Sequence, residues 1–243
     1  LGYDDTLSVT VEEMAHHIAA VGRARPHALV VGDLPWMSYH VSTEETVNNA
    51  ATLIRAGAQC VKLEGGAKRV PMVEALVNAE IPVVGHLGLT PQSIHAMGGF
   101  KVQAKDSRAA LTLVDDAKAL QHAGVFAIVL EGVPDAVAKM VTEALDVPTI
   151  GIGAGPHCDG QVLVYHDLLG LEDRAVPKFV RRYCDQRTGA IDLLLTCATV
   201  ISQALRRPTT WIPNRRRPWR CTGADRPPAP GCHTSVPRYS GDQ

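Results

Sequence analysis

Ionisable side chains follow a series of short apolar runs in this sequence. The segment VKLEGG at 61–66 places Lys62 and Glu64 two residues apart, so both side chains project from one face if the segment is a strand. Asp33, His86 and Glu131 each stand at the end of another apolar run. Since the carboxyl ends of parallel strands meet at one edge of a sheet, we expect these five side chains to lie close together.

The same pattern continues in the last two runs. The glycines of GIGAG at 151–155 end one of them, and His166 with Asp167 follows the other. Taken one at a time, these residues have structural explanations: an Asp caps a helix, a buried His bonds within a core, and a Lys with a Glu forms an ion pair. Taken together, so many charges at one edge would carry a large desolvation penalty unless a ligand or metal joined them.

The residue types indicate what that ligand would be. Asp33 and Glu64 offer the oxygen ligands by which Mg²⁺ is held, together with water and substrate oxygens. Lys62 could neutralise a substrate carboxylate, and a chelated 2-oxo acid would have its carbonyl polarised and its neighbouring C–H acidified. Glu131, alone after an apolar strand, is placed to move a proton.

The elements that must position these residues alternate along the chain. Apolar, β-rich runs occur at 28–32, 60–63, 81–84, 127–130, 147–152 and 162–165, and they predict six parallel strands. Capping boxes at 10–13 and 42–45 predict helix starts, while Gly57 and Gly124 predict helix ends. This alternation predicts βαβ units and a parallel sheet, either open or closed into a barrel.

The barrel is favoured over an open nucleotide-binding sheet. GIGAG gives G-x-G-x-G late in the chain, without the helix and acidic residue that a dinucleotide site requires. Polar residues recur instead at the end of strand after strand, as in a barrel.

Several long motifs, in order, resemble one known family. They are VGDLPWMSY at 31–39, NAATLIRAGAQCVKLEGG at 49–66, GHLGLTPQS at 85–93, GGFKVQ at 98–103, VLEGVP at 129–134 and IGIGAGPHCDGQVLVYHDLLGL at 150–171. These motifs closely resemble ketopantoate hydroxymethyltransferase, and the resemblance extends from Leu1 to about Asp185.

The resemblance implies a (β/α)8 TIM-type barrel and a reaction. The family transfers a hydroxymethyl group from the co-substrate 5,10-methylenetetrahydrofolate to 3-methyl-2-oxobutanoate, giving 2-dehydropantoate for pantothenate synthesis. Carried over by motif, Asp33 and Glu64 lie at the Mg²⁺ site, Asp33 and Lys62 bind the 2-oxo acid, and Glu131 accepts the proton. His86 lines the same mouth and joins the substrate-binding set. The resemblance also implies a homo-oligomer, a decamer in the family.

The sequence departs from the family at both ends. The chain opens on Leu1, and the family's VGDSLG-like segment, which supplies another metal-ligating Asp and a substrate-binding Ser, is absent. We therefore expect an N-terminally truncated barrel with about six of eight strands over 1–185. A helical segment at 186–205 is expected next, and an Arg- and Pro-rich tail at 206–243 is expected to be disordered and to arise from an out-of-register reading of the gene.

Composition excludes some functions and leaves others open. The chain has 243 residues, of which 46% are hydrophobic, and it has neither an apolar run of the ~20 residues needed to cross a bilayer nor a signal sequence, so we expect a cytosolic protein. The net charge of -1 combines +6 in residues 206–243 with -7 in the body, so neither a membrane nor a nucleic acid is the expected partner. A polynucleotide gripped by Trp211 and Trp219, and a metal held by Cys221, Cys232 and His233, are the weaker alternatives. The six cysteines are expected to be free thiols.

Two alternative functions remain beside the transferase. One is a related Mg²⁺-dependent lyase or mutase barrel that also chelates 2-oxo acids, and a folate requirement would separate it from the transferase. The other is an inactive, truncated remnant, because agreement with the family at Asp33, Lys62, Glu64 and Glu131 says nothing about the missing strands.

Overall fold

The computed structural model describes residues 1–99, 102–171 and 176–191 of the chain. The chain divides into two compact units, Leu1–Val162 and Leu163–Gln243. Of the second unit, the structure describes a short helix, α7 (Tyr165–Leu169), which ends at Gly170 in the left-handed conformation, and the segment 176–191. The predicted tail at 206–243, with Trp211, Trp219, Cys221, Cys232 and His233, lies outside the described residues.

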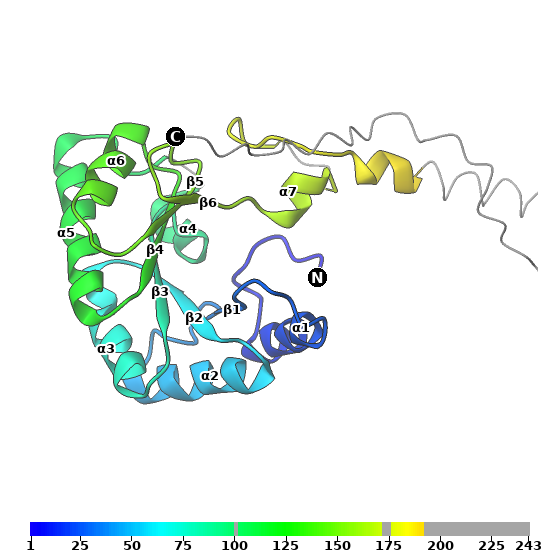
Figure 1. Cartoon of the computed structure of the whole chain (residues 1–243), viewed down its shortest axis with the longest axis horizontal. Coiled ribbons are helices and arrows are strands. Elements are labelled where there is room, and N and C mark those ends of the chain that lie inside the picture. The colour runs from blue at the N-terminus through cyan, green and yellow to red at the C-terminus, as the bar shows by residue number, and fades with distance from the viewer. Residues whose placement is uncertain (100–101, 172–175, 192–243) are drawn as a thin grey trace, which may run out of the picture. The chain divides into compact units, whose positions relative to one another are not determined.

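The first unit contains a parallel sheet whose six strands lie in chain order (Figure 1). The strands are β1 (Val31–Asp33), β2 (Cys60–Glu64), β3 (Val83–Gly88), β4 (Ala127–Glu131), β5 (Thr149–Ile152) and β6 (Gly160–Gln161). Each pairs in parallel with the next, and β1 and β6 each have one strand neighbour in the described part of the chain. The predicted number and parallel direction of the strands are confirmed, although the sixth lies at 160–161 and not at 162–165, and together they form a half-barrel.

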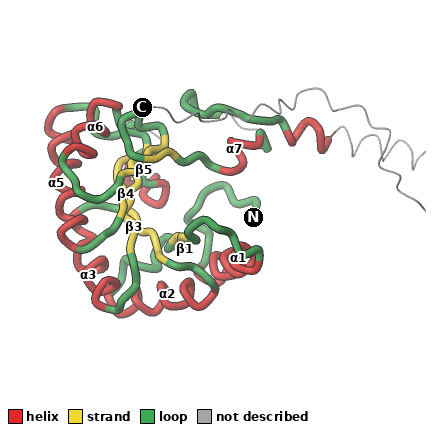
Figure 2. The backbone as a smooth tube through the Cα atoms, viewed as in Figure 1, coloured by secondary structure: helices red, strands yellow, loops and turns green. Residues whose placement is uncertain are grey.

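Helices connect the strands and cover one face of the sheet (Figure 2). The longer ones are α1 (Val11–Arg23), α2 (Thr43–Ala56), α3 (Val70–Asn78), α5 (Ser107–Ala123) and α6 (Asp135–Glu143). Short turns of helix, η1 (Ala67–Arg69), η2 (Pro91–Ser93) and α4 (Ile94–Met97), follow β2 and β3. Helices lie in the crossovers from β1 to β5, because a parallel neighbour cannot be reached by a tight turn, whereas residues 153–159 join β5 to β6 without a helix.

The helix boundaries follow the predicted caps. Thr10 forms a full capping box with Glu13, and the Ser42 hydroxyl accepts from the backbone N–H of Glu45. Gly57 and Gly124 end α2 and α5 with φ of 119° and 102°, in the left-handed region that glycine enters without strain.

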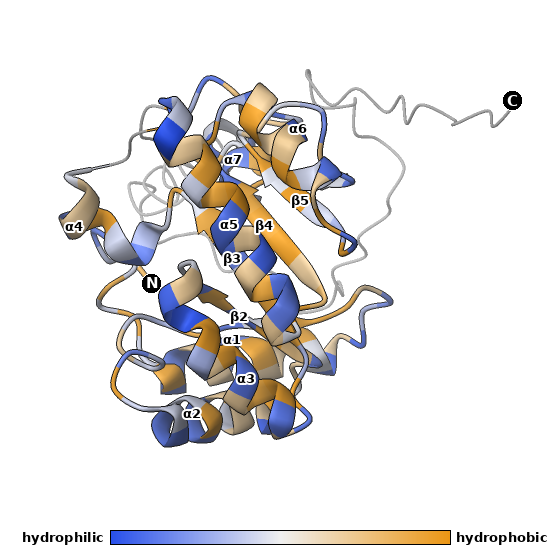
Figure 3. Cartoon of the chain, turned by 90° about the vertical axis from the view of Figure 1, so that its left-hand side faces the viewer, coloured by the Kyte–Doolittle hydropathy of each residue, from blue (hydrophilic) through white to orange (hydrophobic). Residues whose placement is uncertain are grey.

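The main core lies between the sheet and these helices. Leu53 from α2, Val61 and Leu63 from β2, and Leu120 from α5 are fully buried there. Figure 3 shows the apolar colouring of β3 and β4 and the mixed colouring of the helices that cover them. Burial of these side chains stabilises the packed sheet by about 25 cal/mol per Å² of apolar surface. The packed sheet holds the strands in register and thereby fixes the strand ends that carry the charged side chains.

The last predicted strand was wrong. The sheet ends with Gly160–Gln161, after which Val162 donates one further bond to the carbonyl of Gly151. Tyr165 then begins α7, so His166 and Asp167 are helical and do not lie at a strand end. A four-residue apolar run has no period long enough to distinguish a strand from the approach to a helix.

Other strand boundaries moved by one to four residues. β1 begins at Val31 rather than at 28, and β3 extends to Gly88, which places His86 inside the strand rather than after it. No helix in the described residues is long and apolar enough to cross a membrane.

Candidate active site

The alternation of β2 separates its charges from its apolar side chains. Val61 and Leu63 are fully buried in the core beneath the helices, while Lys62 and Glu64 point to the opposite, inner face. The Lys62 ammonium lies 3.8 Å from Glu64 Oε1, so the predicted shared face of these two residues is confirmed.

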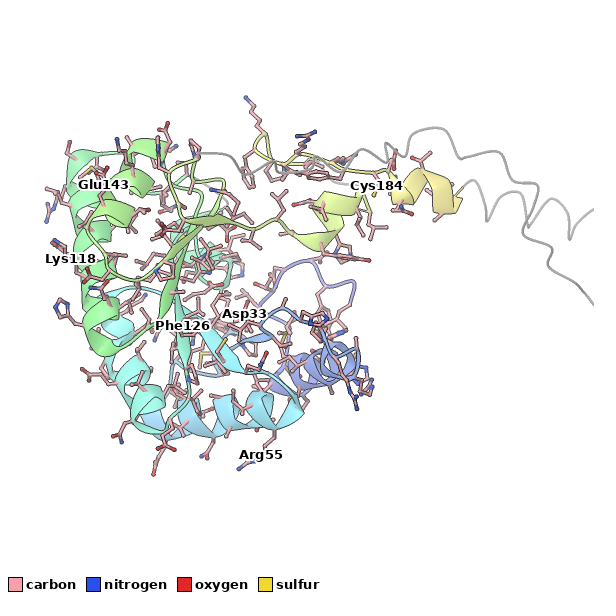
Figure 4. All side chains as sticks on the ribbon, in the orientation of Figure 1. Asp33, Arg55, Lys118, Phe126, Glu143 and Cys184 are labelled. Atoms are coloured by element: carbon pink, nitrogen blue, oxygen red, sulfur yellow. The ribbon has the colours of Figure 1, made fainter. Side chains whose placement is uncertain are left out.

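Strand register brings the remaining residues to the same place. Asp33 pairs with Lys62 across β1 and β2, and Glu64 pairs with His86 across β2 and β3. Glu131 ends β4 opposite Gly88. Figure 4 shows Asp33 on the inner side of the sheet, whereas Lys118 and Glu143 lie on the outer helices.

Gly88 makes the approach of β3 and β4 possible. Its φ is 92°, and a Cβ at this position would lie 2.3 Å from the carbonyl oxygen of Glu131. The next residue, Leu89, donates to that carbonyl at 2.7 Å. Because only glycine accepts both the left-handed φ and the close contact, this residue fixes the strand end that carries Glu131.

Lys62 is the cation at the centre of the group. Its Nζ lies 2.9 Å from Asp33 Oδ1 and 3.3 Å from His86 Nδ1. Burial acts to lower the pKa of Lys62, but the charges of Asp33 and Glu64 outweigh it and leave this pKa raised. The ammonium therefore keeps its proton and carries a fixed positive charge within the site.

Glu64 is a buried carboxylate with several partners. Its Oε1 lies 3.5 Å from His86 Nδ1, and its Oε2 accepts from the backbone N–H of Gln92 at 3.0 Å. Burial acts to raise the pKa of Glu64, yet the contacts with His86 and Lys62 more than compensate and lower it. The carboxylate remains ionised although its side chain is only 4% exposed.

His86 joins the two carboxylates of neighbouring strands. Its Nε2 lies 3.2 Å from Glu131 Oε2, on the side opposite the contact with Glu64. Burial and the charge of Lys62 act to lower the pKa of His86; the carboxylates of Glu131 and Glu64 outweigh them and leave it raised. An imidazole held in this way can pass a proton toward Glu131 or take one from it.

A cavity of about 510 Å³ opens over these residues. All five predicted site residues line it: Asp33, Lys62, Glu64, His86 and Glu131. Apolar side chains from β1, β3, β4 and β5 form much of the remaining wall, including Val31, Val84, Val129 and Ile152. A concave, mostly apolar space with a few convergent charged groups is typical of a small-molecule site.

The donor set suits a hard divalent cation with additional ligands. Asp33 and Glu64 both face the Lys62 ammonium, and Asp33 is 41% exposed, so its carboxylate can turn toward a bound ion. No cluster of three or more His, Cys, Asp or Glu in the described ranges could enclose a metal by itself. Two carboxylates completed by water and substrate oxygens fit Mg²⁺, which usually retains such ligands.

Two buried residues of the site were missed by the sequence analysis. Tyr39 donates to Gln92 Oε1 at 2.7 Å, and its hydroxyl accepts from the backbone N–H of Glu64 at 3.2 Å. Both residues stand within motifs that follow strands, VGDLPWMSY and GHLGLTPQS. Their uncharged side chains gave no signal of the contact, which joins residues 53 positions apart.

Other predictions have simpler outcomes. His166 and Asp167 belong to α7 of the second unit and not to a strand end of the sheet. The cysteines that the structure describes, Cys60, Cys158 and Cys184, are free thiols, as predicted.

A solved structure shares the fold of the chain. Phosphoenolpyruvate phosphomutase from Streptomyces platensis subsp. rosaceus is similar with a TM-score of 0.50 over 81% of this chain and 69% of that one. The sequences are 13% identical, so this likeness concerns the fold alone.

Sequence comparison is far more specific. A family model described as ketopantoate hydroxymethyltransferase matches residues 1–196. The 3-methyl-2-oxobutanoate hydroxymethyltransferase 2 of Bradyrhizobium diazoefficiens is 51% identical over 88% of this chain and 78% of its own length. The 3-methyl-2-oxobutanoate hydroxymethyltransferase of Syntrophobacter fumaroxidans is 62% identical over 75% of this chain and 65% of its own length. The chain belongs to the ketopantoate hydroxymethyltransferase family.

Proposed function

We propose that this chain transfers a hydroxymethyl group from 5,10-methylenetetrahydrofolate to 3-methyl-2-oxobutanoate, giving 2-dehydropantoate for pantothenate synthesis. Family membership supports the reaction, and one observation at the site carries it. Lys62 stands between two carboxylates on one inner face, and Glu131 lies across His86 from them, all within one cavity. This arrangement offers a cation site, an anion site and a proton acceptor at short range.

The residues divide the work by their chemistry. Lys62, permanently charged, binds the carboxylate of the 2-oxo acid, and Asp33 and Glu64 hold Mg²⁺. Mg²⁺, when bound, would polarise the 2-oxo group and acidify the neighbouring C–H.

Glu131 takes the proton from that carbon, and His86 stabilises the carboxyl group at 3.2 Å as it changes charge. The carbanionic carbon forms a C–C bond to the one-carbon unit of the folate, and one water supplies the hydroxyl oxygen of the product. Both C–N bonds of the methylene group break, and the two folate nitrogens take up the proton held by Glu131 and one proton of that water. The apolar walls shield the carbanionic carbon from protonation by bulk solvent.

The test is the release of tetrahydrofolate by the purified chain with Mg²⁺ and both substrates, against a reaction without the 2-oxo acid. Product that depends on both substrates is the expected result. Turnover of 2-oxo acids without folate would favour a lyase or mutase, and a folded chain that releases no tetrahydrofolate would support the inactive remnant.

Replacement of the proton acceptor gives a sharper measure. Glu131→Gln keeps the shape of the side chain and its distance to His86, but removes the base. We expect turnover to fall by about 10²- to 10⁴-fold with little change in substrate affinity, since the group acts in the transition state. Glu143→Gln on the outer face of α6 is the matched control, and full turnover by Glu131→Gln would contradict the assigned role.

The closed barrel, the oligomeric state and the location in the cell belong to the same proposal. A closed (β/α)8 barrel is supported by the chain order of the six parallel strands and by the shared fold described above. A homo-oligomer, a decamer in the family, and a cytosolic location also stay predictions. Light scattering of the purified protein tests the first of these two.

A further inference from the structure

Gln92 lies outside the set of residues that the proposed chemistry uses, yet it contacts the site at three points. It belongs to η2, directly after β3, and is buried with 8% exposure. Its backbone N–H donates to Glu64 Oε2 at 3.0 Å. Its side-chain Nε2 donates to the carbonyl of Leu34 at 2.8 Å, and its Oε1 accepts from the Tyr39 hydroxyl at 2.7 Å.

Tyr39 closes these contacts into a ring. Its hydroxyl donates to Gln92 and accepts from the backbone N–H of Glu64 at 3.2 Å, so Glu64 is held at both its main chain and its carboxylate. A tyrosine hydroxyl is protonated near neutral pH, so it has the proton that it donates to Gln92. The Tyr39 side chain is almost fully buried, so water cannot substitute for either bond.

The orientation of the Gln92 amide follows from its partners. A carbonyl oxygen faces one end of the amide and a hydroxyl that donates faces the other. The flipped amide would set oxygen against the Leu34 carbonyl and leave the hydroxyl proton without an acceptor. One arrangement alone satisfies every buried group.

The side-chain amide of Gln92 also contacts the segment that carries Asp33, through the carbonyl of Leu34. Leu34 directly follows Asp33 at the end of β1, and its own N–H donates to the carbonyl of Lys62 at 2.9 Å. Gln92 thus ties together the ends of β1 and β2, and with them the residues that carry the two carboxylates.

We propose that Gln92, together with Tyr39, is a positioning residue that sets the spacing and direction of Asp33 and Glu64 for a divalent cation. The inference rests on the proposed function, because it concerns the same cation site. Partners that orient ligating carboxylates typically change metal affinity by about 10- to 100-fold when removed.

The test uses Gln92→Met, which keeps the volume and the backbone N–H but removes both side-chain bonds, and Tyr39→Phe, which removes one hydroxyl. Gln121→Met is the matched control, because Gln121 also bonds through both ends of its amide, to Asp146 at 3.0 Å and 2.7 Å, and does not line the cavity. Binding of Mn²⁺ is measured without substrate by electron paramagnetic resonance of the free ion, alongside the melting temperature.

We expect Gln92→Met to weaken Mn²⁺ binding by about 10- to 100-fold and Tyr39→Phe to weaken it by about 10-fold. The control Gln121→Met should bind Mn²⁺ like the wild type, with a melting temperature similar to that of Gln92→Met. The Mn²⁺ affinity of the double variant should lie within about 2-fold of that of Gln92→Met, because both changes break the same network. Tyr39→Phe decides the outcome if Gln92→Met does not fold.

Three results would overturn the inference. Unchanged affinity in both variants would mean that the carboxylates hold their positions without the network. An equal loss in Gln121→Met would mean that general softening, not positioning, weakens binding. A wild-type chain that binds no Mn²⁺ would refute the metal site of the proposed function, and this inference with it, and is recognised before any variant is made.

Discussion

Replacing Lys62 by Met should destabilise the protein in a pH-dependent way. The ammonium lies 2.9 Å from Asp33 Oδ1 and 3.8 Å from Glu64 Oε1, where single charges attract by about 6 and about 4 kcal/mol at an effective dielectric constant of about 20. The Asp33 contact is discounted to roughly half or less, because that side chain is 41% exposed. Removing the ammonium also recovers its desolvation cost, several kcal/mol. The net loss at pH 7 is about 2–3 kcal/mol.

The dependence on pH identifies the cause. The pKa of Glu64 lies below its ordinary value of 4.5 in the folded state, so its stabilising contribution is present above about pH 4.5. That contribution is lost as pH falls through the lowered folded value. The difference between Lys62→Met and the wild type should therefore persist from pH 7 to about pH 5 and shrink toward zero in more acidic solution.

The assay is urea unfolding followed by circular dichroism at pH 7, 5 and 3.5, with Lys118→Met as the control. Lys118 lies exposed on α5, and its loss should change the free energy of unfolding by less than about 0.5 kcal/mol. A destabilisation by Lys62→Met that stays the same at pH 3.5 would refute the electrostatic account and indicate lost packing instead.

Two further predictions concern Gly66 and His86. Gly66→Ala should lower the free energy of unfolding by about 1–3 kcal/mol, because its Cβ would lie 2.1 Å from the carboxyl carbon of Asp116. Asp116→Ala should restore most of that loss in a double-mutant cycle measured by urea denaturation, and additive losses would contradict the clash. His86, whose folded pKa is raised above 6.5, contributes stability that is complete below about pH 6.5 and is lost as pH rises through the folded value. The wild type should lose stability relative to His86→Gln between pH 6 and 9 in thermal melts, and parallel curves would contradict the raised pKa.

Local features of this chain could be read from its sequence. The capping box at Thr10, the N-cap at Ser42 and the helix-ending Gly57 depend on neighbouring residues alone, and the helices begin and end where these predict. The shared face of Lys62 and Glu64 follows from strand alternation, which any two-residue spacing imposes. The five charged residues of the site were found in this way, because each ends or interrupts an apolar run.

Tertiary structure decided what local pattern could not. The run at 162–165 is too short to show a period, and the fold places Tyr165 in a helix. Register set the distances, since Asp33 reaches Lys62, and His86 reaches Glu64, only when the strands align as they do. The ring through Tyr39 and Gln92 joins uncharged side chains 53 residues apart, and such a contact exists only once buried strands have brought two loops together. Sequence determined which charged groups follow the strands, and packing determined which uncharged groups contact them.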